Sequence, residues 1–208
     1  MKRFQAIYML PVLAAAIVVS AIASWTTPAL AQGALKPAVI AIIDSRRLFS
    51  ESKVSEDIRQ QLTKVSQQYA TEENSEREKV LKEKDELEKQ RGLLVQEAFE
   101  EKYTDLKRRA DQLNRKIDLH QKQLNVAQMR ANRELQKVLN PIIKQVAEQR
   151  GATLILEQSQ IVWQTDGLDI TKSVIELLDK QLPSLKVQIP TEAEIIEMEN
   201  QARQGGGQ

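Results

Sequence analysis

Residues 102–150 read KYTDLKRRADQLNRKIDLHQKQLNVAQMRANRELQKVLNPIIKQVAEQR, a pattern typical of one long helix. Its apolar residues recur three or four positions apart, which places them on one narrow stripe of an α-helix. The stripe consists of Leu106, Ala110, Leu113, Ile117, Leu124, Ala131, Leu135, Val138, Ile142 and Val146. A helix with such a stripe needs a partner helix to cover it. The segment therefore predicts one half of a coiled-coil-like pair.

The other half is expected in the preceding fifty residues. The same spacing occurs there at Ile58, Leu62, Val65 and Tyr69. From 51 to 150 the chain contains one glycine, Gly92, and one proline, Pro141, among good helix formers. One straight helix of that length would measure about 150 Å, whereas a hairpin reversing near 92–101 gives two arms of about 60 to 75 Å. We predict the hairpin, with one long parallel coiled coil as the alternative.

The distribution of charge favours antiparallel pairing within the chain. Residues 51–101 hold 9 basic and 14 acidic side chains, and residues 102–150 hold 12 basic and 5 acidic ones. Arms of opposite charge attract each other when they lie side by side, although each exposed ion pair contributes little. The charge pattern thus agrees with a hairpin arm over residues 51–150.

A small body is expected from the segments that flank the arm, residues 38–50 and 151–182. Val39–Ile43 is β-branched and predicts a buried strand, with a helix starting near Ser45. Residues 153–156 and 161–165 predict two further strands joined by a tight turn, and 170–181 predicts a helix. The predicted fold class is α+β, a helical hairpin projecting from this body.

The body is expected to be completed by oligomerisation. Its segments hold about 45 residues, and domains of about 40 residues usually need disulfides, metals or assembly. The chain has no cysteine, so disulfides are excluded. Three short strands would also leave edges open to another chain. The residues expected in the shared body are Val39, Ile40, Ile42, Ile43, Leu154, Leu156, Val162 and Trp163.

The two ends of the chain are predicted to lie outside this unit. Residues 1–31 have the layout of a secretory signal peptide: basic Lys2 and Arg3, an apolar run, and Ala-Leu-Ala before the expected cleavage. An uncleaved membrane anchor is the alternative. Residues 183–208 form an acidic tail bracketed by prolines, expected to be partly disordered and to contain a helix from 192 to 203.

Composition argues against an enzyme and against a nucleic-acid-binding protein. The formal net charge is +1, and −1 once Lys2 and Arg3 are removed, whereas nucleic-acid binders are usually basic. The single histidine, His120, lies among polar neighbours and is expected on a solvated helix surface. No phosphate-binding loop or catalytic constellation is apparent. We expect no catalytic residue, cofactor or metal site.

Two groups of residues are candidates for contact with a partner. Leu93, Leu94, Val95 and Phe99 lie at the predicted reversal, where they either contact a bound protein or pack the turn. Lys107, Arg108, Arg109, Arg115 and Lys116 cluster on the second arm. These cations either bind an anionic partner or form ion pairs with the acidic first arm.

The order of these segments resembles the Skp (OmpH-like) family of periplasmic chaperones. The resemblance rests on VIAIIDSRRLF from Val39 to Phe49, and on TLILE, IVW and DIT between 153 and 171. It covers residues 38 to about 182. It implies a homotrimer with a shared β-barrel body, whose arms enclose unfolded outer-membrane proteins without ATP.

The resemblance leaves other functions to be weighed. A coiled-coil envelope scaffold that binds folded partners is the main alternative, and weak contact with an anionic membrane surface through the second arm is another. Family members are often strongly basic, and this chain departs from that pattern after removal of the signal peptide. The acidic tail after Pro190 is also an addition to the family pattern.

Overall fold

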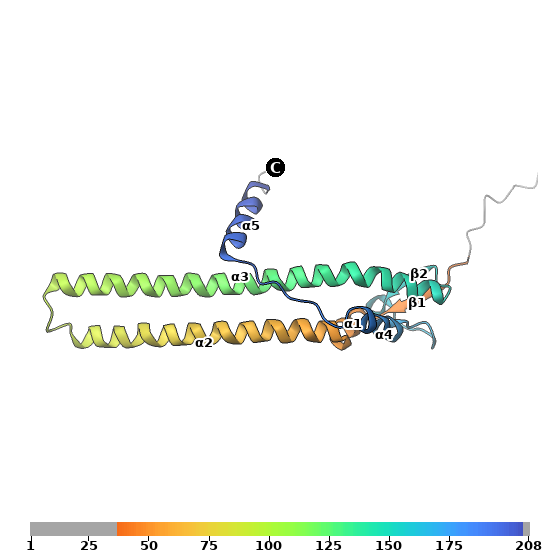
Figure 1. Ribbon diagram of the computed structural model, residues 1–208, viewed down its shortest axis with the longest axis horizontal. Coiled ribbons are helices and arrows are strands. Elements are labelled where there is room, and N and C mark those ends of the chain that lie inside the picture. The colour runs from red at the N-terminus through yellow and green to blue at the C-terminus, as the bar shows by residue number, and fades with distance from the viewer. Residues whose placement is uncertain (1–36, 206–208) are drawn as a thin grey trace, which may run out of the picture. The chain divides into compact units, whose positions relative to one another are not determined.

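Two long helices dominate the computed structural model, which describes residues 37–205 (Figure 1). The elements are β1 (Ile40–Ile43), α1 (Ser45–Glu51), α2 (Lys53–Lys89), α3 (Gln96–Gln149), β2 (Leu154–Glu157), the 3-10 turn η1 (Gln158–Gln160), α4 (Thr171–Gln181) and α5 (Glu192–Gly205). The described residues from Ala38 onward belong to one unit. The expected signal peptide lies outside the described residues, as do residues 206–208 of the tail.

Helices α2 and α3 lie antiparallel and form the predicted hairpin (Figure 1). Their 37 and 54 residues correspond to about 55 and 80 Å at 1.5 Å per residue. The chain reverses over 90–95 rather than over 92–101, because α2 ends at Lys89 and α3 already begins at Gln96. Backbone hydrogen bonds from Leu93 N–H and Leu94 N–H to Gln90 O, at 2.9 and 3.1 Å, hold this turn.

The sheet is smaller than the sequence predicts. Strands β1 and β2 are parallel, with Ile40 opposite Leu154 and Ile43 opposite Glu157. On its other side β1 is bridged to the segment before α4: Ile42 N–H donates to Leu168 O at 2.8 Å, and Ile170 N–H donates to Ile42 O at 2.9 Å. Strand β1 is therefore paired along both edges, whereas β2 has one edge open within the described residues.

The predicted strand at 161–165 is wrong for this chain. The chain leaves β2 through η1, and residues 161–165 form no strand. The connecting residues Gln158, Ser159 and Gln160 lack the Asn-Gly or Asp-Gly pair that a tight hairpin favours. Because β1 is already paired on both sides, the segment also finds no place beside that strand.

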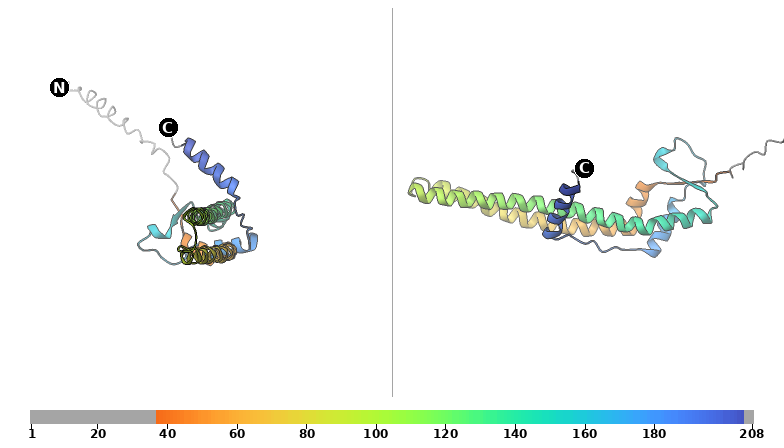
Figure 2. Two further views of the ribbon diagram at one scale, coloured as in Figure 1. Left: turned by 90° about the vertical axis from the view of Figure 1, so that its left-hand side faces the viewer. Right: turned by 90° about the horizontal axis from the view of Figure 1, so that it is seen from above.

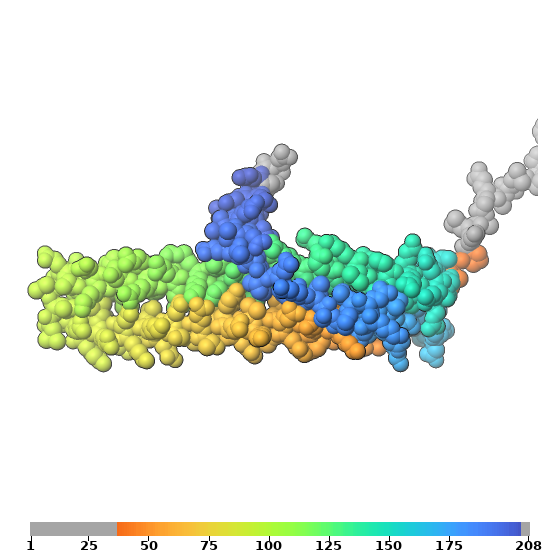
Figure 3. All heavy atoms as spheres, in the orientation of Figure 1, coloured from red at the N-terminus to blue at the C-terminus, as the bar shows by residue number. Residues whose placement is uncertain are grey.

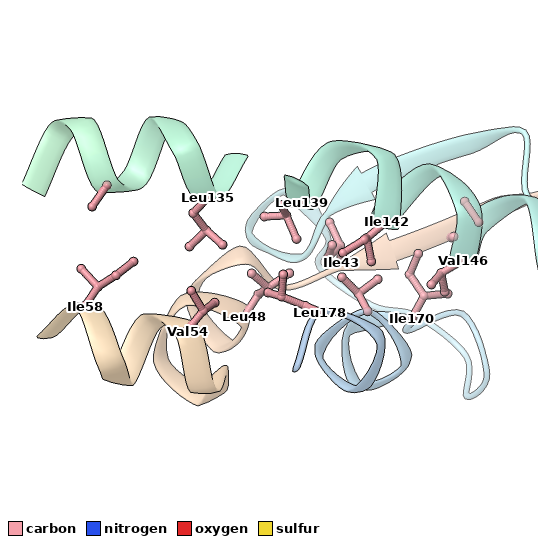
Figure 4. Close-up of a cluster of buried hydrophobic side chains, with 14 residues drawn as sticks. Ile43, Leu48, Val54, Ile58, Leu135, Leu139, Ile142, Val146, Ile170 and Leu178 are labelled. Atoms are coloured by element: carbon pink, nitrogen blue, oxygen red, sulfur yellow. The ribbon is translucent and has the colours of Figure 1, made fainter. Parts of the chain in front are cut away.

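The core joins the body to the base of the arm (Figure 4). Buried apolar side chains come from β1, α1, the bases of both arm helices and α4; they include Ile43, Leu48, Val54, Ile58, Leu135, Leu139, Ile142, Val146, Ile170, Val174 and Leu178. The body predicted from 38–50 and 151–182 therefore completes much of its core within its own chain. The small size of the body is therefore a weaker reason to expect oligomerisation. The apolar side chains that stay exposed on the body are the better evidence for it.

The junction between α3 and β2 depends on one glycine. Gly151 has φ +69°, in the left-handed region that side chains disfavour. Its N–H donates to Glu148 O at 2.9 Å, and Ala152 N–H donates to Ala147 O at 2.9 Å. These bonds satisfy carbonyls at the end of α3 and turn the chain back into β2.

Candidate functional site

The hairpin tip presents two exposed apolar side chains. Leu93 and Val95 are 84% and 71% exposed, and Leu94 is half-buried. Phe99 lies in the first turns of α3, where it stacks on Tyr103 with ring centroids 6.3 Å apart. Leu93 and Val95 are thus available to a partner, whereas Phe99 packs against Tyr103 of its own helix and Arg91 of the turn.

Only some of the cations of the second arm are available. Arg109 donates two hydrogen bonds to the Glu83 carboxylate of the first arm, at 2.6 and 2.7 Å. Lys116 donates to Glu72 and Glu76 at 2.6 and 2.8 Å. The hydrogen bond with Glu72 raises the pKa of Lys116 and lowers the pKa of Glu72. These two cations bridge the arms, as the charge pattern suggested.

The other three cations point to solvent. Arg108 pairs with Asp105 of its own helix at 3.1 Å, and Lys107 and Arg115 are exposed. The cluster predicted from the sequence is therefore divided between arm pairing and open surface. It does not form one continuous anion-binding patch, because Arg109 and Lys116 are committed to the first arm.

His120 is buried, and its predicted place on a solvated surface is wrong. It is 8% exposed, and its ring stacks on Tyr69 with centroids 3.7 Å apart and planes 7° apart. His120 Nδ1 lies 2.7 Å from Glu73 Oε1, and Tyr69 donates its hydroxyl hydrogen to Gln123 Oε1 at 3.1 Å. Burial raises the pKa of Tyr69. This polar cluster joins the arms beside residues 71–79 of the first arm, which include no large apolar residue.

The body carries the largest exposed apolar side chains outside the tip. Trp163 is 80% exposed and Val162 is fully exposed, both on the segment that forms no strand. Val39, Ile40 and Leu154 are also exposed, around the β1–β2 pair. Of the other predicted body residues, Ile42 and Ile43 are buried within the chain, and Leu156 is half-buried.

A largely apolar groove lies between the end of α3 and the start of β2, and its lining also includes Asn140, Lys144, Glu148 and Thr153. Ile143 and Ala147 of α3 form one wall, and Ala152, Leu154 and Ile155 form the other. The groove includes the first two residues of β2, Leu154 and Ile155, and β2 has one edge without a strand partner among the described residues. Such an edge invites pairing with another chain.

A comparison with models of protein families identifies the family to which this chain belongs. The model of the family described as outer membrane protein (OmpH-like) matches residues 39–178. The chain belongs to the OmpH-like family. The match includes β1, the hairpin, β2 and most of α4, and it leaves out the acidic tail of this OmpH-like protein.

A solved structure agrees with the family. The chain is similar to the crystal structure of a proposed OmpH-like outer membrane chaperone from Caulobacter crescentus CB15, with a TM-score of 0.70 and 25% identity. The similarity covers 78% of this chain and 98% of that one. A comparison with curated proteins gives no match. The resemblance to OmpH-like proteins is therefore confirmed by sequence and by structure.

Two classes of site are not found in the described part of this OmpH-like chain. No helix there is long and apolar enough to cross a membrane. No group of three or more His, Asp or Glu side chains between residues 37 and 205 is placed to hold a metal ion. The candidate surfaces are therefore the tip, the cross-arm cluster and the open edge of the body.

Proposed function

We propose that this protein is a periplasmic holdase chaperone that encloses unfolded outer-membrane β-barrel proteins without ATP. Membership of the OmpH-like family and the similarity to a proposed outer membrane chaperone support a chaperone role. The client class and the holdase mechanism are our proposal. Unfolded β-barrel chains carry strands with unpaired edges and apolar faces, which aggregate when left exposed.

The observation that carries the proposal is the incomplete surface of the body. Trp163 and Val162 are exposed on the segment after η1, which pairs with no strand among the described residues, and β2 has one open edge. Gln164 nearby has a buried side-chain oxygen without a hydrogen-bond partner among the described residues. Exposed apolar side chains and an open strand edge are surfaces that a second copy can cover, so we expect this segment to be completed by another copy.

Assembly through the body would place several arms around one space. In a homotrimer, three hairpins projecting from a common body could surround a client without binding any one sequence tightly. Leu93 and Val95 would supply weak apolar contacts at the tips, and the exposed cations Lys107, Arg108 and Arg115 would supply charged contacts to the client or an anionic membrane surface. Weak, numerous contacts suit a client that must be released without nucleotide hydrolysis.

The proposed location follows from the N-terminal sequence. A cleaved signal peptide at residues 1–31 would export the chain to the periplasm, the compartment that unfolded outer-membrane proteins cross. Mass spectrometry of the protein secreted by its native host would show an N-terminus near Gln32. An N-terminus at Met1 in the mature protein would contradict export by cleavage.

The proposal is tested with a denatured outer-membrane β-barrel protein diluted into buffer without nucleotide. A molar excess of the mature chain should suppress light scattering by the client, and the Leu93→Ser/Val95→Ser variant should suppress it less. Asn114→Ser, an exposed polar change on the same arm, is the matched control. Unchanged aggregation at excess chaperone would contradict the holdase function. Capture of only a folded envelope protein would favour a scaffold.

A further inference from the structure

The acidic tail is bound to the arm by specific contacts. From Leu182 to Pro190 the chain runs along α2, where Leu185 N–H donates to Asp57 Oδ2 at 3.1 Å. The side-chain amide of Gln61 donates to Leu185 O and accepts from Val187 N–H, both at 2.9 Å. Gln61 thus pairs with the tail backbone as a neighbouring strand would. Figure 3 shows this segment lying across the hairpin before it reaches α5.

The tail then passes from α2 to α3. Pro190 is fully buried, and its carbonyl accepts a hydrogen bond from Gln123 Nε2 at 2.8 Å. The start of α5 is fixed by a reciprocal capping pair: Thr191 N–H donates to Glu194 Oε2 at 2.8 Å, and Glu194 N–H donates to Thr191 Oγ1 at 3.3 Å. The helix therefore begins at the surface of α3.

One face of α5 is complementary to α3 in shape and charge. Ile195 is 4% exposed, and it lies between two carboxylates that reach cations of α3. Glu194 pairs with Arg130 at 3.0 Å, and Glu199 pairs with Lys122 at 2.6 Å. The hydrogen bond from Lys122 lowers the pKa of Glu199; the backbone of Thr191, followed by Arg130, lowers that of Glu194.

The attachment of α5 is nevertheless limited to this face. Ile196 is 50% exposed, and the end-on view in Figure 2 shows the helix projecting away from α2 and α3. A helix of 14 residues is marginal in water by itself, and exposed ion pairs contribute little each. The tail is also absent from the family match over residues 39–178. The contact between α5 and α3 uses specific ion pairs and one buried side chain, but its free energy is small. A helix bound in this way can be exchanged for another ligand.

We propose that the face of α3 formed by Lys122, Gln123 and Arg130 is a binding site for an acidic amphipathic helix, and that α5 is its tethered, displaceable occupant. The site recognises an apolar residue, Ile195 in α5, with one carboxylate directly before it and another four residues after it. It also recognises an extended segment before the helix, whose backbone carbonyl at Pro190 accepts a hydrogen bond from Gln123. A tethered ligand has an effective concentration on the order of 1 mM. A free peptide with a Kd of about 0.1 mM would therefore bind the intact chain roughly tenfold more weakly than a vacated one.

The first test is a zero-length carbodiimide cross-link on the unmodified chain. Lys122 Nζ and the Glu199 carboxylate are 2.6 Å apart, so an amide should form between them and disappear in Glu199→Gln. Chains labelled with ¹⁴N and ¹⁵N, unfolded and refolded together, separate links within one chain from links between copies. Links within one chain support the proposal. Absence of the link, or its formation only between copies, overturns it.

The second test uses a vacated site in the full-length chain. In E194K/I195D/E199K two carboxylates of the resident helix are replaced by cations and its buried anchor by a carboxylate, while α3 is unchanged. A dye-labelled peptide of residues 190–203 should bind this variant by fluorescence anisotropy about tenfold more tightly than it binds the unmodified chain. Adding K122M/R130M, which removes these cations of α3 without giving the resident lysines new partners, should abolish the binding. Equal binding to all three proteins, or no binding to the vacated variant while its helical circular dichroism is intact, overturns the proposal.

Discussion

Replacing His120 by alanine tests whether the middle of the arm is held by a buried polar cluster. The change removes the ring stacked on Tyr69 and the group 2.7 Å from Glu73. An aromatic pair is worth about 0.5 to 1.5 kcal/mol. A hydrogen bond to a charged group is worth about 1.5 to 3 kcal/mol. Together they predict a local destabilisation of about 2 to 4.5 kcal/mol, whereas a change on an exposed surface usually stays within about 0.5 kcal/mol.

Native-state hydrogen exchange measures this effect where it occurs. A loss of about 2 kcal/mol should speed the exchange of amides near His120 and Tyr69 by roughly thirtyfold, if they open locally. Amides at the base of the arm, around Leu139, should change much less. Asn114→Ala, an exposed substitution on the same helix, is the control. If both variants exchange alike within a factor of two, the cluster does not join the arms.

Three further changes test the packing, the chain reversal and the ion pairs. Leu135→Ala, in the fully buried base of the arm, should cost about 2 to 5 kcal/mol in urea unfolding at fixed protein concentration; a cost below 1 kcal/mol would contradict that burial. Gly151→Ala should cost about 1 to 2 kcal/mol because φ is +69°, and an unchanged midpoint would contradict a left-handed cap. The lowered pKa of Glu199 means that its ion pair is complete above the ordinary value of 4.5 and is lost as pH falls through the lowered value. A dye at Ile196→Cys should therefore lose anisotropy only below about pH 4.5, and the loss should become smaller when Lys122 is also replaced by methionine, because only the Glu194–Arg130 pair then remains to be broken.

The hairpin could be predicted from the sequence because its cause is local. The apolar spacing and the scarcity of glycine and proline favour a helix within each arm. The opposite charges of the two halves favour pairing between the arms. The turn was displaced by a few residues because α3 continues back to Gln96, with Phe99 and Tyr103 packed along its first turns. Helix ends depend on such contacts more than on composition.

The strand at 161–165 shows where propensity fails. Its β-branched and aromatic residues favour a sheet only where another strand offers an edge and a surface to pack on. Here η1 replaces the tight turn that a hairpin with β2 needs, so Ile161–Thr165 pairs with no strand among the described residues. The residue types at 161–165 favour a strand, but they do not show whether the neighbouring strand comes from the same chain or from another copy.

His120 could have been found from helical spacing alone. It lies three residues after Ile117 and four before Leu124, and both belong to the apolar stripe. Its polar neighbours in sequence lie on other faces of the helix and are poor guides to its burial. The docking of α5, by contrast, depends on Lys122 and Arg130 meeting Glu199 and Glu194 across more than sixty residues, for which the sequence holds no local signal.

The number of copies in the assembled protein tests the proposed cage most directly. Native mass spectrometry and sedimentation equilibrium of the mature chain, from Gln32 onward, should give three copies at micromolar concentration. The Trp163→Asp variant should shift the mass towards one copy while its helical circular dichroism is retained. A mature chain that stays monomeric at these concentrations, with the same fold, would contradict a body shared among subunits and the enclosure of clients built on it.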